Sequence, residues 1–65
     1  MSGPYLFTVT ASGHEFEWHL YNTRTTPPRL IERGTKPSRL GAVNEGSMRA
    51  RRANEKWAKA VNGSR

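Results

Sequence analysis

Residues 5–21, YLFTVTASGHEFEWHLY, decide the fold of this chain. Residues 5–10 and 15–21 are rich in aromatic and β-branched side chains and alternate between two faces, which is typical of β-strands. Residues 11–14 between them, Ala-Ser-Gly-His, are turn-forming. The stretch therefore predicts a β-hairpin whose apolar faces lie on the same side, because a hairpin is not stable alone.

The chain leaves the hairpin through residues 22–28, Asn-Thr-Arg-Thr-Thr-Pro-Pro. Two prolines cannot lie in a central strand, because proline has no amide hydrogen to donate. Residues 29–33, Arg-Leu-Ile-Glu-Arg, contain two apolar side chains and are limited by Gly34 and Pro37. We expect them to form a short strand at the edge of the sheet, where an open edge invites pairing with another chain.

The apolar period changes after Pro37, which indicates a helix over residues 39–61. Ser38 is a suitable N-cap residue, and Gly63 is a natural C-terminal stop. Between them, apolar and small side chains recur at three- and four-residue steps and form one stripe along the helix. The stripe consists of Leu40, Val43, Ser47, Ala50, Trp57 and Val61, with Ala53 and Ala60 beside it.

Two glycines make the start of this helix ambiguous. Gly41 and Gly46 each weaken it by about 1 kcal/mol relative to alanine, so the helix begins either at residue 39 or only near Asn44. The small residues of the stripe suggest that the helix backbone lies close to the sheet.

The predicted fold class is α+β, a three-stranded antiparallel sheet (a hairpin plus a short edge strand) with one C-terminal helix packed on it, in the order β-β-β-α. We expect a single domain over residues 1–65, frayed at residues 1–4 and 62–65. A chain this short buries only about 60% of its unfolded surface, so its stability is marginal. The predicted core consists of Phe7, Val9, Phe16, Trp18, Leu20, Ile31, Leu40, Val43, Ala50, Ala53 and Trp57.

The composition excludes several classes of protein. The chain has no cysteine, so it has neither disulfides nor thiolate metal sites. It contains no apolar run of about 18 residues that could span a membrane. Its first residues, Met-Ser-Gly-Pro-Tyr, lack the basic and apolar regions of a signal peptide. We expect a cytoplasmic protein with no membrane partner.

Residues 14–19, His-Glu-Phe-Glu-Trp-His, place two imidazoles and two carboxylates close together in sequence. On a strand, Glu15, Glu17 and His19 share a face, but the end members lie about 13 Å apart and cannot meet at one metal ion. Simple alternation, with apolar side chains inward and these three outward, explains the same residues. We therefore favour a solvated face over a metal site, and expect neither a metal nor another cofactor.

Enzymatic activity is not indicated. Acid/base catalysis needs a pocket that shifts a pKa, and one sheet with one helix leaves little room for a pocket. The chain has no nucleophile motif and no glycine-rich phosphate loop. We expect a binding protein rather than an enzyme, with no small-molecule substrate.

Positive charge is the main functional signal. The chain has 11 Lys and Arg against 5 Asp and Glu, a formal net charge of +6, which favours nucleic acid, anionic lipid or acidic proteins as partners. Arg49, Arg52, Lys56 and Lys59 recur at helical steps and form a basic stripe, with Arg51 to one side. Such a stripe is expected of a surface that follows phosphates, and the alternative is an ordinary solvated helix face.

Two acidic residues reduce the charge of this stripe. Glu45 precedes Arg49 by four residues and Glu55 precedes Lys59 by four, the favourable order for intrahelical ion pairs. Aromatic rings could add a stacking platform for single-stranded nucleic acid if they were exposed. The alternation places only Tyr21 outward, so the other rings of the hairpin are expected in the core.

Three features also carry a family resemblance. They are an aromatic-rich first strand, Tyr5-Leu-Phe-Thr-Val, a second strand, Phe16-Glu-Trp-His-Leu-Tyr21, and a helix led by Ser38 that contains Ala42, Gly46 and Ala50. In this order they resemble the small bacterial YegP-like domains over most of residues 5–57. The chain departs from that pattern after Asn22, where the family usually has an Asn-Gly-type turn. The resemblance implies a β-β-β-α unit, often paired with a second copy, with no established enzymatic activity.

Two functions remain open from the sequence. The first is weak binding of nucleic acid or another polyanion through Arg49, Arg51, Arg52, Lys56 and Lys59. The second is a protein-interaction module, a homodimer that pairs sheet edges or helix faces. Phosphate binding weakens steeply with salt, whereas association through apolar surface does not, because salt screens mainly exposed charges.

Overall fold

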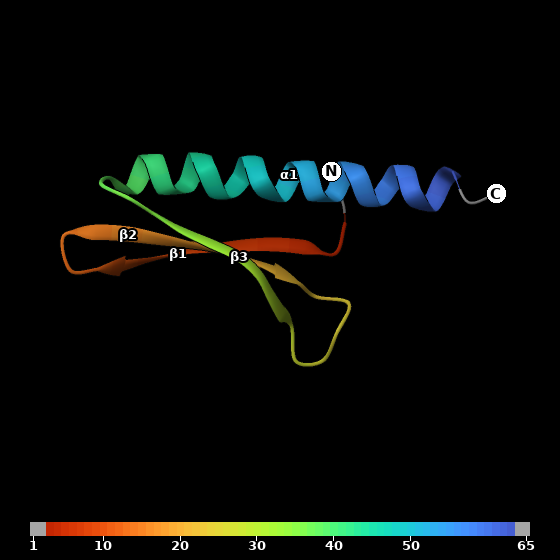
Figure 1. Ribbon diagram of the computed structural model, residues 1–65, viewed down its shortest axis with the longest axis horizontal. Coiled ribbons are helices and arrows are strands. Elements are labelled where there is room, and N and C mark those ends of the chain that lie inside the picture. The colour runs from red at the N-terminus through yellow and green to blue at the C-terminus, as the bar shows by residue number, and fades with distance from the viewer. Residues whose placement is uncertain (1–2, 64–65) are drawn as a thin grey trace.

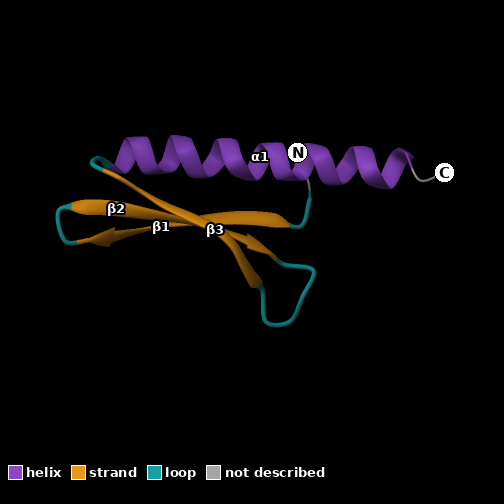
Figure 2. Ribbon diagram, in the orientation of Figure 1, coloured by secondary structure: helices purple, strands orange, loops and turns teal. Residues whose placement is uncertain are grey.

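The computed structural model describes residues 3–63, which form three strands followed by one helix (Figures 1 and 2). The elements are β1 (Tyr5–Ser12), β2 (Glu15–Asn22), β3 (Arg29–Lys36) and α1 (Arg39–Gly63). The strands make one antiparallel sheet in the order β1-β2-β3, and α1 lies along one face of it (Figure 1). The predicted β-β-β-α fold of the α+β class is thus confirmed.

The hairpin of β1 and β2 forms as the alternation predicts. Its turn is only Gly13 and His14, and Gly13 has a φ of 63°. A positive φ at the first turn residue alone fits a type II′ turn, whose twist matches that of the strands. Trp18 and Leu20 are buried on the face that meets α1, while Tyr5, Phe7, Val9 and Phe16 pack partly buried around them. The hydrophobic core therefore lies between the hairpin and the helix.

Gly34 lies inside β3 instead of ending it. It pairs with Trp18 of β2, and a Cβ at this position would lie 2.8 Å from the indole ring. The missing side chain makes room for the ring, a common reason for glycine inside a strand. As a result β3 continues to Lys36, beyond the predicted segment 29–33.

A β-bulge lies in the middle of β3. Leu20 pairs with Glu32, but the next residue of β2, Tyr21, pairs with Leu30, which leaves Ile31 without a partner. A bulge of this kind bends the strand and turns the extra side chain out of the regular alternation. Ile31 is 45% exposed, so its assignment to the core is wrong.

The helix packs on the sheet through small residues four apart. Ala42, Gly46, Ala50 and Asn54 are buried. A Cβ at Gly46 would lie 2.5 Å from the ring atom Cδ2 of Phe7, so this glycine lets the helix backbone approach the sheet.

Leu40 does not join this buried row. Two residues correspond to about 200° around a helix, so Leu40 lies on the far side from Ala42 and is 71% exposed. Its assignment to the core is wrong, because the helix turns its small residues rather than its first leucine toward the bulky rings of the hairpin. Among the other predicted core residues of α1, Ala50 is buried and Val43, Ala53 and Trp57 are half-buried.

The helix begins at Arg39 rather than at Asn44. The side-chain Oγ of Ser38 accepts a hydrogen bond from the backbone N–H of Gly41 (3.1 Å), and its backbone oxygen accepts one from Ala42 (3.1 Å). Ser38 is therefore the N-cap, as predicted, and it satisfies amide hydrogens that have no partner inside the helix.

Asn54 joins α1 to the start of β1. Its Oδ1 accepts a hydrogen bond from the backbone N–H of Tyr5 (3.0 Å), and its Nδ2 donates to the backbone oxygen of Tyr5 (3.1 Å). The backbone oxygen of Pro4 accepts hydrogen bonds from the backbone N–H (2.8 Å) and Oγ1 (2.7 Å) of Thr23. Pro4, which we expected to be frayed, is thus bonded to the segment that follows β2, and Gly3 lies against Asn54 without room for a Cβ.

The predicted fraying at the other end of the chain falls on residues 62–65. Asn62 and Gly63 belong to α1. Residues 1, 2, 64 and 65 lie outside the described part of the chain.

Candidate polyanion-binding surface

The five predicted site residues lie on two sides of α1. At about 100° per residue, Arg49, Arg52, Lys56 and Lys59 share one flank of the helix, and Arg51 lies roughly 120° away from the centre of that flank. Arg49 reaches Glu32 of β3, so this flank faces the third strand. We call it the β3-side flank.

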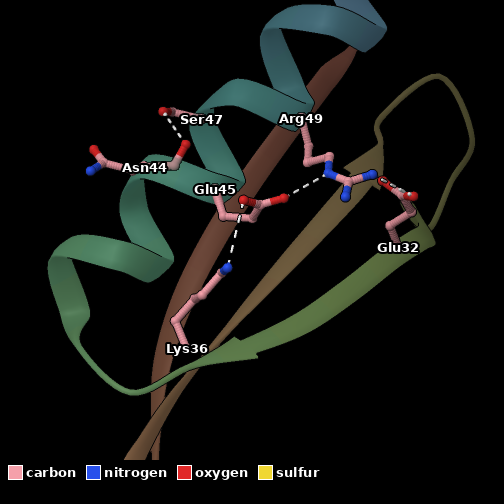
Figure 3. Close-up of polar contacts among 6 residues, drawn as sticks. All are labelled: Glu32, Lys36, Asn44, Glu45, Ser47 and Arg49. Atoms are coloured by element: carbon pink, nitrogen blue, oxygen red, sulfur yellow. Dashed lines mark hydrogen bonds and ion pairs between the residues drawn. The ribbon is translucent and has the colours of Figure 1, made fainter.

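Arg49 is occupied by contacts within the protein (Figure 3). Its Nε donates a hydrogen bond to Oε2 of Glu45 (2.9 Å), and its Nη1 donates to Oε2 of Glu32 (3.3 Å). Its guanidinium carbon also lies 5.7 Å from the ring centroid of Trp18, within cation–π range. Arg49 therefore links α1 to β3 and to the core, and two carboxylates offset its charge.

Glu45 is the acidic centre of this network. Its carboxylate also lies 3.9 Å from Nζ of Lys36, at the end of β3. The hydrogen bond from Arg49, together with the charge of Lys36, holds the pKa of Glu45 below its ordinary value. The same hydrogen bond raises the pKa of Arg49. The intrahelical pair Glu45–Arg49 is as predicted, whereas residues 3–63 show no ion pair between Glu55 and Lys59.

The lowered pKa of Glu45 predicts a pH-dependent stability. In the unfolded chain this carboxyl titrates near 4.5; in the folded chain it titrates lower, so the unfolded state binds more protons as the pH falls. The stabilisation by the Glu45 carboxylate is complete at a pH above its pKa in the unfolded chain. It is lost as the pH falls through its lower pKa in the folded chain. Glu45→Gln should lower the melting temperature at about pH 7, and this deficit should shrink at about pH 3.5.

Thermal unfolding followed by circular dichroism at several pH values measures this effect. Glu55→Gln is the matched control, because Glu55 lies on the same helix with no ion pair within the described chain. A deficit for Glu45→Gln that is equally large at both pH values would contradict the assignment.

Four cations of α1 are exposed and take part in no ion pair within residues 3–63: Arg51, Arg52, Lys56 and Lys59. Three of them, Arg52, Lys56 and Lys59, continue along the β3-side flank. Their Cα atoms rise by about 6 Å and then by about 4.5 Å along the helix axis. These three side chains form a short positive row beyond Arg49.

A hollow of about 510 Å³ lies beside this row, between α1 and the bulged part of β3. Its apolar wall consists of Tyr5, Leu20, Ile31, Ala53, Trp57 and Ala60. Its charged side chains are Glu32, Arg49, Arg52 and Lys56. The structure therefore places three of the predicted site residues, Arg49, Arg52 and Lys56, beside an apolar hollow, and two of them, Arg52 and Lys56, form no ion pair within residues 3–63.

Sequence reasoning missed this hollow, since the fold seemed to leave little room for a pocket. Part of its wall comes from the bulge residue Ile31, which the strand pattern does not reveal. The sequence contains one signal for this hollow. Ala53 and Ala60 are small residues one turn before and after Trp57, and they leave space beside its ring. The indole Nε1 of Trp57 is buried and has no hydrogen-bond partner within the described residues, which is uncommon for a buried polar atom.

Within residues 14–19, Glu17 and His19 form a pair on the outer face of the sheet. Nε2 of His19 lies 3.2 Å from Oε1 of Glu17, and the His19 ring stacks on Tyr21 with 6.3 Å between centroids. Over the described residues, no three His, Cys, Asp or Glu side chains are placed to hold one metal ion. Trp18 and Leu20 are buried in the core, so the alternation along β2 places Glu17 and His19 on the opposite face, as predicted. Their side chains are only 31% and 16% exposed, so this part of the face is less solvated than expected.

Comparisons with known proteins add nothing to this geometry. In the part of the chain that the structure describes, the helix is not long and apolar enough to cross a membrane. No protein-family model, curated protein or solved structure matches the chain. The resemblance to YegP-like domains therefore stays a prediction from the residues that carry it.

Proposed function

We propose that the protein binds nucleic acid, or a comparable polyanion, weakly through the β3-side flank of α1. One observation carries the proposal: Arg52, Lys56 and Lys59 are exposed in a row and have no carboxylate partner within residues 3–63. Cations placed in this way can neutralise phosphates of one strand. The proposal includes the predicted cytoplasmic location and a role in binding rather than catalysis.

Arg49 has an indirect part in this proposal. Its contacts with Glu45 and Glu32 offset the negative charge of these two carboxylates, so that this end of the flank stays attractive to an anion. Arg51 lies on another side of the helix and adds to the net charge without joining the row. In this proposal the side chains that bind phosphate are therefore those of Arg52, Lys56 and Lys59.

Binding through three cations predicts a defined salt dependence. The slope of log K against log salt should be about −2 for a single strand and about −2.7 for a duplex. A fourfold increase in salt should then weaken binding about 20- to 40-fold. Fluorescence anisotropy of labelled single-stranded and double-stranded oligonucleotides at several salt concentrations measures this slope.

Two charge-reversal variants distinguish binding by the positive row from binding by the net charge of the protein. Arg52→Glu should weaken binding at least tenfold, whereas Arg51→Glu, the same change on another side of the helix, should weaken it only about two- to threefold. Equal losses for the two variants would mean that net charge alone attracts the ligand. Absence of binding even at low salt would refute the proposal.

A second candidate function, self-association, is favoured by the exposed surface. Leu6 (55% exposed), Tyr21 and Leu30 (43% exposed) are neighbours across the three strands on the outer face and supply an apolar row for it.

A further inference from the structure

We propose that the hollow between α1 and β3 receives an unpaired base of a single-stranded nucleic acid, while the adjoining phosphates lie on Arg52 and Lys56. This inference rests on the function proposed above and specifies the form of nucleic acid that the same site recognises. It is carried by the position of the two cations, which belong both to the positive row and to the side of an apolar hollow.

The hollow has the size and chemistry of a site for a flat organic group. Its volume, about 510 Å³, falls within the range of roughly 300–1,000 Å³ that is usual for small-ligand sites. Two aromatic residues, Tyr5 and Trp57, lie in its wall, and Leu20 is buried beneath them. Stacking on aromatic side chains is how proteins bind unpaired bases without regard to sequence.

The charges beside the hollow favour an anion attached to that group. Arg52 and Lys56 are exposed and form no ion pair over residues 3–63, whereas Glu32, the one acid of the wall, is paired with Arg49. A phosphate joined to a base therefore meets two cations, and the residues that line the hollow offer it no unpaired carboxylate.

A duplex cannot make the same use of this site. Its bases are stacked and paired, so it presents mainly phosphates to a positive helix face, and phosphate contacts alone carry no interaction with an apolar wall. A single strand can satisfy the cations and the hollow together. Single strands should therefore bind more tightly than duplexes, although a duplex has the higher charge density.

The decisive comparison is between a single strand and an abasic strand of the same length, about ten nucleotides, which keeps the phosphates and lacks the bases. At each salt concentration, anisotropy should show the normal strand binding at least about fivefold more tightly. A series of salt concentrations should give the same slope for both strands, because both keep the phosphates. Equal affinities would overturn this inference and leave the proposed function standing. If neither strand binds at low salt, both fail.

A matched pair of variants tests the location. Ala60→Leu places an aliphatic side chain at the hollow and should remove the preference for the normal strand while the abasic strand binds as before. Ala58→Leu is the same change on the same helix at a residue that does not line the hollow, and it should keep the preference. Loss of the preference in both variants, or in neither, would contradict the assignment to the hollow.

A fluorescence titration of the unmodified protein provides a test that does not depend on the folding of a variant. Trp57 lies in the wall of the hollow, and Trp18 is buried in the core. The normal strand should quench tryptophan emission in parallel with the anisotropy change, and the abasic strand should not. Equal quenching by both strands would overturn the inference. Equal displacement of the normal strand by an acidic peptide of the same charge would likewise overturn it, because the site would then not recognise bases.

Discussion

Asn54→Ala is expected to lower the free energy of unfolding by about 2–4 kcal/mol, the largest loss we predict for a single truncation. The change removes both hydrogen bonds that join α1 to the backbone of Tyr5. A domain of 65 residues is typically stable by about 3–10 kcal/mol. The variant should therefore lose a large share of the free energy that keeps the domain folded.

The loss is large because no other strand can replace Asn54. The N–H and C=O of Tyr5 point away from β2 and toward the side chain of Asn54 in α1. β1 is an edge strand, so it has no strand on that side. In an antiparallel pair, residues that do not bond to the neighbouring strand turn both groups to the other side. The amide of Asn54 has one acceptor and one donor in the arrangement of a peptide group, so it acts there as a partner strand would. Without it, partly buried backbone groups are left unsatisfied.

Chemical denaturation followed by circular dichroism measures this prediction. Asn44→Ala is the matched control, because Asn44 is exposed on the same helix; alanine should there leave stability unchanged or raise it by a few tenths of a kcal/mol, roughly its propensity gain. Asn54→Asp keeps the acceptor for the Tyr5 N–H and loses the donor, so it should fall between the wild type and Asn54→Ala. A loss for Asn54→Ala no larger than that of the control would show that the two hydrogen bonds are unimportant.

Gly46→Leu is expected to lower the free energy of unfolding by about 1–3 kcal/mol, although leucine forms helices better than glycine. A Cβ at Gly46 would already lie 2.5 Å from Cδ2 of Phe7, and a leucine side chain needs still more room. Phe7 in turn packs against the core that contains Trp18 and Leu20. The ring cannot move away without opening the contact between α1 and the hairpin.

The other glycine near the start of α1 provides the control. At Gly41 the nearest atom to a Cβ is Oγ of Ser38 at 3.2 Å, the tip of an exposed side chain. Gly41→Leu should therefore change stability by no more than about 1 kcal/mol, because the gain in helix propensity is opposed only by a small shift of the Ser38 cap. Adding Phe7→Ala to Gly46→Leu should recover part of the loss, as expected for residues in contact. Equal effects at Gly41 and Gly46 would contradict the close approach at Phe7.

The elements and their order could be predicted because their signals are local. Alternation over residues 5–10 and 15–21 defines which side chains share a face of the hairpin, and Ser38 and Gly63 mark the helix near both of its ends. The positive row is local in the same way, because spacing of three and four residues on a helix places side chains on one flank whatever the helix packs against. These properties depend on residues a few positions apart.

Only the tertiary structure decided which of these surfaces meet. Leu40 and Ala42 lie on different faces of α1, and from the sequence either face could pack on the sheet. The face of Ala42 does so because Phe7 of the hairpin packs against Gly46, a residue far from Phe7 in the sequence. The ion pair between Arg49 and Glu32 also depends on the register of β3 against β2, and so does the bulge at Ile31.

The sequence by itself thus determined the three strands, the helix and its row of cations, because periodicity is a property of neighbouring residues. The tertiary structure alone decided which cations remain free and that an apolar hollow lies beside Arg52 and Lys56. Both depend on side-chain packing between segments that are distant in the chain, and packing responds to shape at each contact rather than to pattern.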